Sequence, residues 1–431
     1  MSNKKEAGAA PAAISDHTPP ITGGKFFYGW VIAFASSLGI AFSVSVYLPT
    51  TTGLLVGPLH RDFGWTAPQI FLALTFATTS TILAAPFVGN LIDRYGARLV
   101  VAVSFLIEAL LIASMRYMNH DIRWFYARYA AFALFSTGTT AIGFSALISR
   151  WFNKRRGLAL GIALGGLGVG GVFWSLLTQF LFDRFGWRDT FVYLGAIIAL
   201  LVLPILMATL RNSPQSMGLE VDGEPSSGLT RTKEVGGVML REAMRDGQYW
   251  LMLITFLLIA CATYGVILNL VPLLQKQGAS AQYAAAAQAS IWSVLVLGRV
   301  VTGWLMDRYF APRVALCFLI PPIVGIAMLA VGVNGPSAFA AAMLVGLAAG
   351  AEVDVMAYLA GRYFGLRHFG AIYATFFSIY AIGTSAGPVF TAWLVARNGD
   401  YQSAMWCLVG ALCVASAMLF RFRPFHRPSS H

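Results

Sequence analysis

Long apolar runs alternate with short polar segments along most of this chain. Each run has about 20 residues, which is the length that a helix needs to cross the hydrocarbon core of a bilayer. The pattern predicts an all-α membrane protein with twelve transmembrane helices. The expected spans are 28–55, 67–91, 98–118, 124–149, 158–182, 189–210, 249–274, 284–306, 314–333, 337–361, 369–395 and 402–421.

The polar segments suggest how the chain is divided. Residues 1–24 are rich in Ala, Pro and small polar residues and lack the apolar core of a signal peptide, so we expect a disordered cytoplasmic tail. The longest internal polar run, 211–247, follows the sixth span. We therefore expect six-helix halves at 25–210 and 248–423, a cytoplasmic linker at 211–247 and a cytoplasmic tail at 424–431.

Composition agrees with this class and its charges orient the chain. Hydrophobic residues make up 58% of the sequence and charged residues only 11%, against about 25% charged residues in soluble domains. The net charge of +12 could suggest a nucleic-acid partner, but 21 Lys and Arg lie on tails and loops of one side and 8 on the other. The positive-inside rule then predicts that both termini lie in the cytoplasm, and no nucleic-acid module remains. We expect the plasma (inner) membrane as the location.

Two features that could indicate metal or cofactor binding do not fit their positions in the chain. The four cysteines fall within predicted spans and form no Cys-x-x-Cys pair. Gly166–Gly171 matches a dinucleotide fingerprint, but it lies inside a predicted membrane span, where small residues serve close helix packing. We therefore expect no enzyme activity, no metal site and no cofactor.

The chain repeats itself once. Asp93-Arg94-Tyr95 at the end of the second span recurs 214 residues later as Asp307-Arg308-Tyr309 at the end of the eighth. Arg150-Trp-Phe and Arg362-Tyr-Phe support a period of nearly the same length. The repeat predicts two parallel six-helix halves, an arrangement expected of transporters that rock around a central site.

Ionisable residues at membrane depth are the candidate functional groups. Arg299 stands alone in an apolar run, roughly 12 Å from the loop end of its helix, and a charge there is costly enough to mark a site or a partner. Glu352 and Asp354 lie at similar depth, and their spacing turns them in different directions, so at most one should face Arg299. Glu108 lies mid-span, and its role stays open.

Two interpretations of these charges remain. A buried carboxyl group tends to be protonated unless a cation favours its charged form. Glu352 or Asp354 could then act as a proton switch, occupying Arg299 when ionised and releasing it to an anionic substrate when protonated. The alternative is a permanent structural ion pair.

The loop motif gives the chain a family resemblance. Gly89, Asp93, Arg94 and Gly96 fit the Gly-x-x-x-Asp-Arg-x-Gly signature between helices 2 and 3 of the major facilitator superfamily, and the sequence resembles that family from Phe26 to about Phe425. The second copy has Phe310 in place of the second glycine. The resemblance implies that Asp93, Arg94, Asp307 and Arg308 act in gating.

Further motifs resemble one branch, that of oxalate/formate exchangers and monocarboxylate transporters. They are Tyr28-Gly-Trp30, Phe63-Gly-Trp65, Arg150-Trp-Phe152 with Arg155-Arg-Gly-Leu-Ala159, and Arg362-Tyr-Phe-Gly365. The resemblance implies that Arg299 occupies the branch's anion-binding place. The chain departs from this branch in helix 11, which has Ser378, Ile379 and Tyr380 and no lysine as a second cation. Arg299 alone suits a substrate with one carboxylate better than a substrate with two.

We therefore expect a proton-coupled symporter of a small organic monocarboxylate, which works as a monomer in the bilayer. A proton-coupled exporter of lipophilic or drug-like compounds and an anion exchanger are the alternatives. Besides Arg299, the expected substrate-binding residues are polar or aromatic side chains at pocket depth. They are Tyr47, Asn269, Trp292, Tyr358 and Tyr380.

Overall fold

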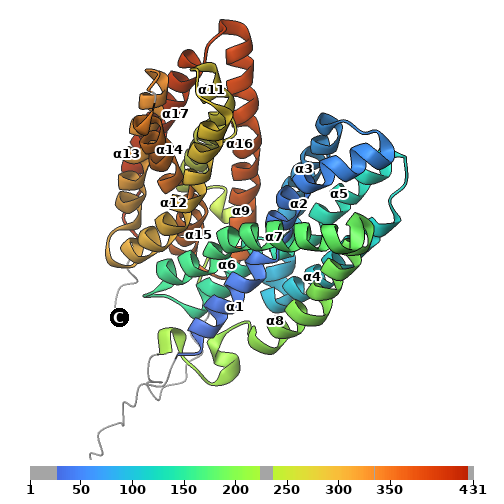
Figure 1. Ribbon diagram of the computed structural model, residues 1–431. Coiled ribbons are helices and arrows are strands. Elements are labelled where there is room, and N and C mark those ends of the chain that lie inside the picture. Colours follow the sequence, from blue (N-terminus) through green and yellow to red (C-terminus); the bar gives the residue numbers. More distant parts are fainter. Residues whose placement is uncertain (1–26, 224–235, 334, 426–431) are drawn as a thin grey trace, which may run out of the picture.

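The computed structural model describes residues 27–223, 236–333 and 335–425 (Figure 1). The predicted tail at 1–24, part of the predicted linker and the end of the C-terminal tail lie outside the described residues. Within the described ranges the chain is almost entirely helical, and an isolated bridge between Gly237 and Gly365 is the one β-type pairing.

The N-terminal half contains six membrane crossings. Its helices are α1 (Gly29–Ala41), α2 (Val44–Phe63), α3 (Ala67–Tyr95), α4 (Ala97–Ser114), α5 (Ile122–Ser136), α6 (Ala141–Trp151), α7 (Arg156–Ile197) and α8 (Leu203–Thr209). Short 3-10 turns η1 (Met115–Tyr117) and η2 (Thr137–Thr139) and a π turn η3 (Ile198–Val202) connect some of them. The continuous helical stretch from Arg156 to Thr209 holds two crossings, because Gly186 at φ 74° turns the chain inside it.

The C-terminal half repeats this plan. Its helices are α10 (Gly247–Ile267), α11 (Leu270–Lys276), α12 (Ala281–Arg308), α13 (Ala311–Ala330), α14 (Pro336–Ala349), α15 (Glu352–Tyr363), α16 (Phe369–Asn398) and α17 (Gln402–Phe420). Between the halves, η4 (Pro214–Met217), η5 (Val221–Gly223) and the short α9 (Leu240–Ala243) belong to the linker. Eleven helical stretches of the described chain are long and apolar enough to span a membrane. Counting both crossings of the Arg156–Thr209 stretch, the predicted twelve-helix, two-half architecture is confirmed.

Four of the predicted spans are broken in the middle, a feature that the hydropathy pattern did not indicate. The first span divides into α1 and α2, the fourth into α5 and α6, the seventh into α10 and α11, and the tenth into α14 and α15. Side chains replace some of the lost helical hydrogen bonds: Thr139 Oγ1 accepts from Val44 N at 3.3 Å, and Asn269 Nδ2 donates to Gly265 O at 2.9 Å. Irregular backbone at membrane depth is tolerated where it is covered by protein in this way.

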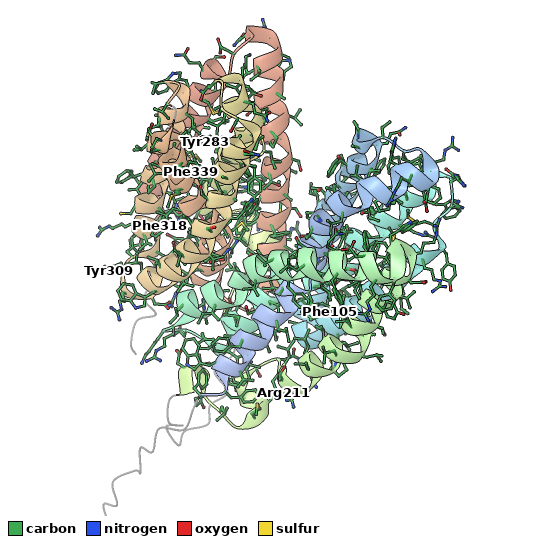
Figure 2. All side chains as sticks on the ribbon, viewed as in Figure 1. Phe105, Arg211, Tyr283, Tyr309, Phe318 and Phe339 are labelled. Carbon is green, nitrogen blue, oxygen red and sulfur yellow. The ribbon has the colours of Figure 1, made fainter. Side chains whose placement is uncertain are left out.

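The two halves meet at one end of the molecule and separate toward the other (Figure 1). We call the end where Asp93, Gly157, Asp307 and Gly370 lie the linker end, and the opposite end the far end. The pairs α3/α16 and α7/α12 make the main contacts between the halves. Figure 2 shows how densely side chains fill each half around its helices.

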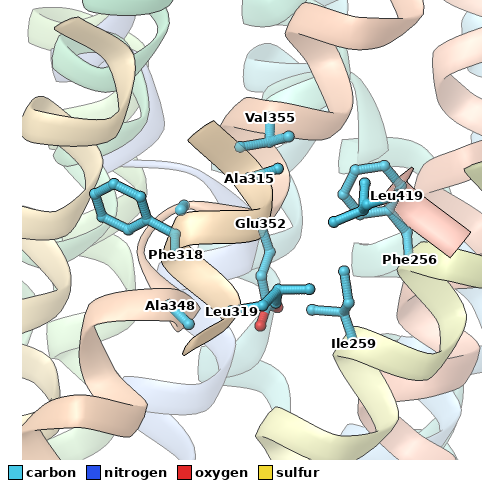
Figure 3. A pocket seen from close by; sticks show the side chains of 10 residues that line it. Phe256, Ile259, Ala315, Phe318, Leu319, Ala348, Glu352, Val355 and Leu419 are labelled. Carbon is cyan, nitrogen blue, oxygen red and sulfur yellow. The ribbon is translucent and has the colours of Figure 1, made fainter. Parts of the chain in front are cut away.

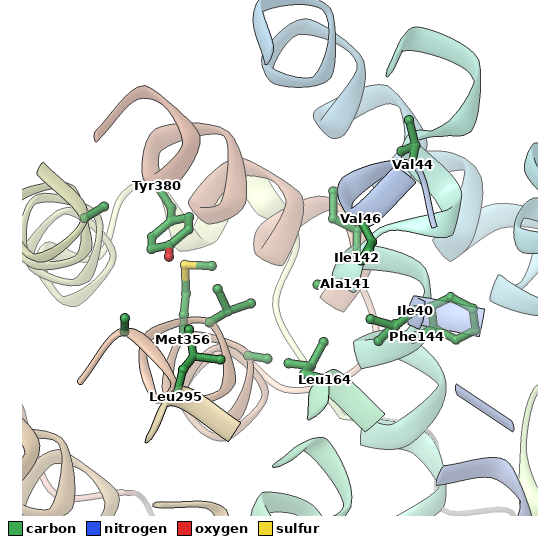
Figure 4. Packing of buried hydrophobic residues seen from close by; sticks show 14 of the residues in the cluster. Ile40, Val44, Val46, Ala141, Ile142, Phe144, Leu164, Leu295, Met356 and Tyr380 are labelled. Atoms are coloured by element: carbon green, nitrogen blue, oxygen red, sulfur yellow. The ribbon is translucent and has the colours of Figure 1, made fainter. Parts of the chain in front are cut away.

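Glycine pairs allow this close approach. A Cβ on Gly157 would lie 2.3 Å from Gly303 O, and a Cβ on Gly303 would lie 2.3 Å from Gly157 O. Gly89 and Gly370 face one another in the same way at the pseudo-equivalent contact, with 2.3 and 2.4 Å. Small residues are what membrane helices need in order to bring their backbones together. Beside these contacts an apolar cluster spans both halves, with Leu164 on one side and Leu295 and Met356 on the other (Figure 4).

Candidate functional site

Arg299 forms a buried ion pair with Asp354. Its Nη1 lies 2.7 Å from Asp354 Oδ1, and the two side chains are 4% and 0% exposed. Arg299 Nε and Asp354 Oδ2 have no hydrogen-bond partner among the described residues. The pair is therefore held by a single contact, and both the guanidinium and the carboxylate keep an unused polar atom.

The break in the tenth span determines where Asp354 lies. Gly350 and Ala351 separate α14 from α15, so that Glu352 and Asp354 lie in the first turn of α15. The N-terminus of a helix favours negative charge. Gly350 also lets α12 approach, because a Cβ there would lie 2.2 Å from Leu295 O and 3.2 Å from Arg299 N. The broken helix thus brings a carboxylate, a helix N-terminus and the arginine to one place.

Glu352 points elsewhere. Its Oε2 accepts a hydrogen bond from Tyr380 Oη at 3.0 Å, while Oε1 has no partner among the described residues. The Glu352 side chain is also the one polar side chain that lines a small apolar pocket between α10, α13, α14, α15 and α17 (Figure 3). The pocket is otherwise lined by Phe256, Ile259, Ala315, Phe318, Leu319, Ala348, Ala351, Val355 and Leu419. Asp354 thus contacts Arg299, and Glu352 contacts Tyr380. The two acids point in different directions, as their spacing led us to expect.

The other expected pocket residues have their described contacts away from Arg299. Tyr47 packs in the N-terminal half against Phe132 and Trp174. Asn269 Nδ2 donates to Gly265 O at the break of the seventh span and to Pro388 O of α16. Tyr358 Oη donates to Met306 O at 3.1 Å, and Trp292 is 48% exposed.

The two repeated aspartates bridge the halves at the linker end. Asp93 of α3 accepts hydrogen bonds from Gly370 N and Ala371 N, both at 2.8 Å, at the start of α16. Asp307 of α12 accepts from the first amides of α7 in the same way. Each carboxylate thus caps a helix of the opposite half, where it meets unpaired amides and the positive end of the helix dipole.

The neighbouring arginines do not share this contact. Arg94 lies over the ring of Tyr95 and Arg308 over the ring of Trp304, each within its own half. A different arginine crosses the gap: Arg362 donates through Nη1 to Asn153 Oδ1 at 2.9 Å and through Nη2 to Asn153 O at 2.7 Å. The sequence marked Arg362 only as part of the repeat and of a branch motif, and nothing in it singled out Asn153.

The linker contacts the loop that carries Asn153. Asp222 Oδ2 accepts from Asn153 N at 3.2 Å and from Lys154 N at 2.8 Å. On the other half, Val238 N donates to Phe364 O at 3.0 Å. The linker therefore holds the loops that precede α7 and α16, whose first amides the two aspartates cap.

Comparison with known proteins agrees with this architecture. The sequence profile of the Major Facilitator Superfamily matches residues 30–353. The chain belongs to the Major Facilitator Superfamily. It is a multi-pass membrane transporter, and the members of this family are not enzymes.

Relatives and structures within the superfamily are distant. The chain is 26% identical to monocarboxylate transporter 11 of Mus musculus, over 93% of this chain and 89% of that protein. It is 24% identical to YhjX of Escherichia coli, an uncharacterized transporter of the superfamily, over 79% and 82%. The transporter FucP in its outward conformation matches with a TM-score of 0.68 at 12% identity, over 92% of this chain and 100% of that one. The xylose–proton symporter XylE matches with a TM-score of 0.67 at 16% identity, over 93% and 97%.

Proposed function

We propose that this superfamily member is a secondary active transporter of a small organic monocarboxylate, coupled to protons by symport. The proposal rests mainly on one observation, the buried contact between Arg299 and Asp354 at 2.7 Å. A planar guanidinium binds carboxylates through two parallel hydrogen bonds, and here only one such bond is described. The relatives that are named monocarboxylate transporters support the same substrate class.

In the proposed cycle, a proton binds to Asp354 and the substrate binds to Arg299. When Asp354 is ionised it neutralises the arginine, and the pair stays closed. Protonation of Asp354 removes its charge, so an anionic substrate becomes the better partner for the buried cation. Since a buried arginine without a counter-charge is costly, each event favours the other, and this gives coupling.

Glu352 is a second proton-binding candidate in this scheme. Its neighbour Tyr380 lies on α16, which also carries the Gly370 amide bonded to Asp93. A change of charge at Glu352 would therefore act on a helix that belongs to the gate. Tyr47, Asn269, Trp292 and Tyr358 remain predictions as substrate contacts, as do Arg94 and Arg308 as gating residues.

The distribution of Lys and Arg favours one orientation of the protein in the membrane. The excess of Lys and Arg on the loops of the linker end favours a cytoplasmic location for that end and for both termini, in the plasma (inner) membrane. With this orientation the halves are joined on the cytoplasmic side, and the protein is in an outward-facing state. The opposite state requires that the bonds of Asp93, Asp307 and Arg362 break.

A proton-coupled exporter of lipophilic compounds is the second candidate. Glu352 favours it, because a buried carboxyl group among apolar side chains can bind a proton without Arg299 (Figure 3). An exporter of this kind would need Glu352 and would tolerate loss of Arg299. An anion exchanger would need Arg299 but no proton.

The deciding experiment combines ligand binding with uptake. Purified protein is screened by thermal shift against aliphatic and aromatic monocarboxylates, dicarboxylates, sugars and amines, because a ligand of the folded state raises its stability. The best ligand is then measured with Arg299→Lys, Arg299→Gln and the charge-neutral pair Arg299→Gln/Asp354→Asn. Uptake into proteoliposomes is followed with and without an inward proton gradient.

The proposal expects affinity for a monocarboxylate to fall sharply in all three variants and wild-type accumulation to need the gradient. Arg397→Gln is the control, since Arg397 stacks on Trp393 near the far end of α16. Wild-type affinity in well-folded Arg299→Lys and Arg299→Gln would end the carboxylate-site idea.

A further inference from the structure

A third buried carboxyl group lies in the N-terminal half and is used by nothing described above. Glu108 of α4 is 0% exposed. Neither of its carboxyl oxygens has a hydrogen-bond partner among the described residues. Buried polar groups are nearly always paired, so an unpaired carboxyl in a protein interior calls for an explanation.

Glu108 lies against the breaks of the first and fourth spans. Thr139 of η2 and Tyr47 of α2 lie near enough to Glu108 to act on it electrostatically. Thr139 also joins the two breaks, because its Oγ1 accepts from Val44 N. Ser104, one helical turn before Glu108 on α4, packs against η2. Its hydroxyl oxygen would lie 2.4 Å from a Cβ added at Gly138.

Nothing described around Glu108 can balance a negative charge. Thr139 donates its hydroxyl hydrogen to Ser136 O at 2.8 Å, so this hydrogen is already used. Tyr47 is a neutral phenol, and none of the ion pairs described in this structure includes Glu108. An ionised carboxylate without a partner in such a place is expensive, and the group takes up a proton instead.

We propose that Glu108 is a proton-binding site of the N-terminal half. It holds a proton in the conformation seen here and releases it when the breaks of the first and fourth spans rearrange. Each half then has a carboxyl group at a broken helix: Glu108 beside the fourth span and Glu352 at the start of α15. The inference goes beyond the proposed function, which places its protons in the C-terminal half, and it does not depend on the substrate.

Infrared spectroscopy of the full-length protein in lipid nanodiscs tests the first part without substrate or transport. The carbonyl band of a protonated carboxyl group is compared between wild type and Glu108→Gln, with Glu352→Gln and Asp354→Asn as comparators. We expect Glu108→Gln to lose one protonated-carboxyl band and to keep a melting temperature close to that of wild type, because a neutral amide replaces a neutral acid. Loss of an ionised-carboxylate band instead would overturn the proposal.

Two further arms complete the test. If Glu108→Gln does not fold, Thr139→Val should shift the frequency of the band without removing it, and an unchanged band contradicts the assignment. Sodium is added at constant ionic strength, and stabilisation of wild type but not of Glu108→Gln would make the site a cation site rather than a proton site.

The release step is tested in the Asp93→Asn/Asp307→Asn background, which should open the linker end. The Glu108 band is taken as the difference between this background with and without Glu108→Gln. It should weaken when the linker end opens. A band of unchanged intensity in a variant shown to be open would refute release by this movement.

Discussion

Asp307 of α12 accepts a hydrogen bond from the backbone amide of Gly157 in the opposite half, at 2.7 Å. The second oxygen of the same carboxylate accepts from Leu158 N at 2.9 Å. Asp93 makes the equivalent pair of bonds to Gly370 and Ala371. The two halves are thus held by carboxylates on helix N-termini, so each contact depends on a negative charge at that position.

Replacing Asp307 by Asn should open the linker end. Hydrogen bonds to charged groups contribute about 1.5–3 kcal/mol, so the closed arrangement should lose roughly ten- to hundredfold in population. Spin labels at Leu99 and Arg313, both exposed near the linker end, report the separation of the halves. Asp93→Asn should act in the same direction.

Asp189→Asn is the matched control for this substitution. Asp189 pairs with Arg116 within the N-terminal half, and both side chains are nearly half exposed. It should leave the distance distribution unchanged. Equal distributions in Asp307→Asn and wild type would mean that the carboxylate does not hold the gate.

Gly157→Ala should block the same closure by a steric route. The added methyl group would lie 2.3 Å from Gly303 O, which is backbone and cannot rotate away. Overpacking of this kind costs about 1–3 kcal/mol, and here the cost falls only on the closed linker end. We expect a shift toward an open linker end and slower uptake in proteoliposomes.

Gly171→Ala on the same helix α7 is the control, because a methyl group there meets nothing within 4 Å. It should keep wild-type uptake and spin-label distances. If Gly157→Ala behaves like Gly171→Ala, the glycine contact is not needed for closure.

The sequence revealed the twelve crossings and the deep charges for the same physical reason. Hydrocarbon tolerates only long apolar helices and makes a charge such as Arg299 expensive, so both stand out in a hydropathy pattern. The breaks did not stand out, because a few residues such as Thr139 and Asn269 change the average over a span very little. They depend on which backbone group each side chain reaches in the folded protein.

Pairing was the part of the site that the sequence could not predict. The spacing of Glu352 and Asp354 indicated that they diverge, but which of them meets Arg299 depends on the break at Gly350 and on the rotation of α15. The partners of Asp93 and Asp307 are backbone amides, which carry no residue type that a sequence could mark. Asn153 was missed for a similar reason, since its part in the gate comes from its place opposite Arg362.

The orientation of the chain in the membrane can be tested by labelling single cysteines. In a variant without the native cysteines, Ser216→Cys in the linker and Thr66→Cys at the far end each provide an exposed site. With the linker end in the cytoplasm, an impermeant maleimide added to intact cells should label Thr66→Cys and leave Ser216→Cys unlabelled until the cells are opened. The reverse pattern would invert the orientation and make the structure inward-facing.

Asp354→Asn should destabilise the protein more than Glu352→Gln does. Removal of Asp354 leaves Arg299 as a buried charge without its partner, and breaking a buried pair in this way costs about 3–5 kcal/mol. Glu352 contacts the neutral hydroxyl of Tyr380, and glutamine can still accept that bond, so little should be lost. Melting temperatures of the purified variants measure the difference, and a monocarboxylate ligand should restore stability to Asp354→Asn because its carboxylate replaces the missing charge beside Arg299. Equal melting temperatures for Asp354→Asn and wild type would show that the arginine finds another counter-charge. Failure of every carboxylate to stabilise a folded Asp354→Asn protein would count against Arg299 as the substrate's anchor.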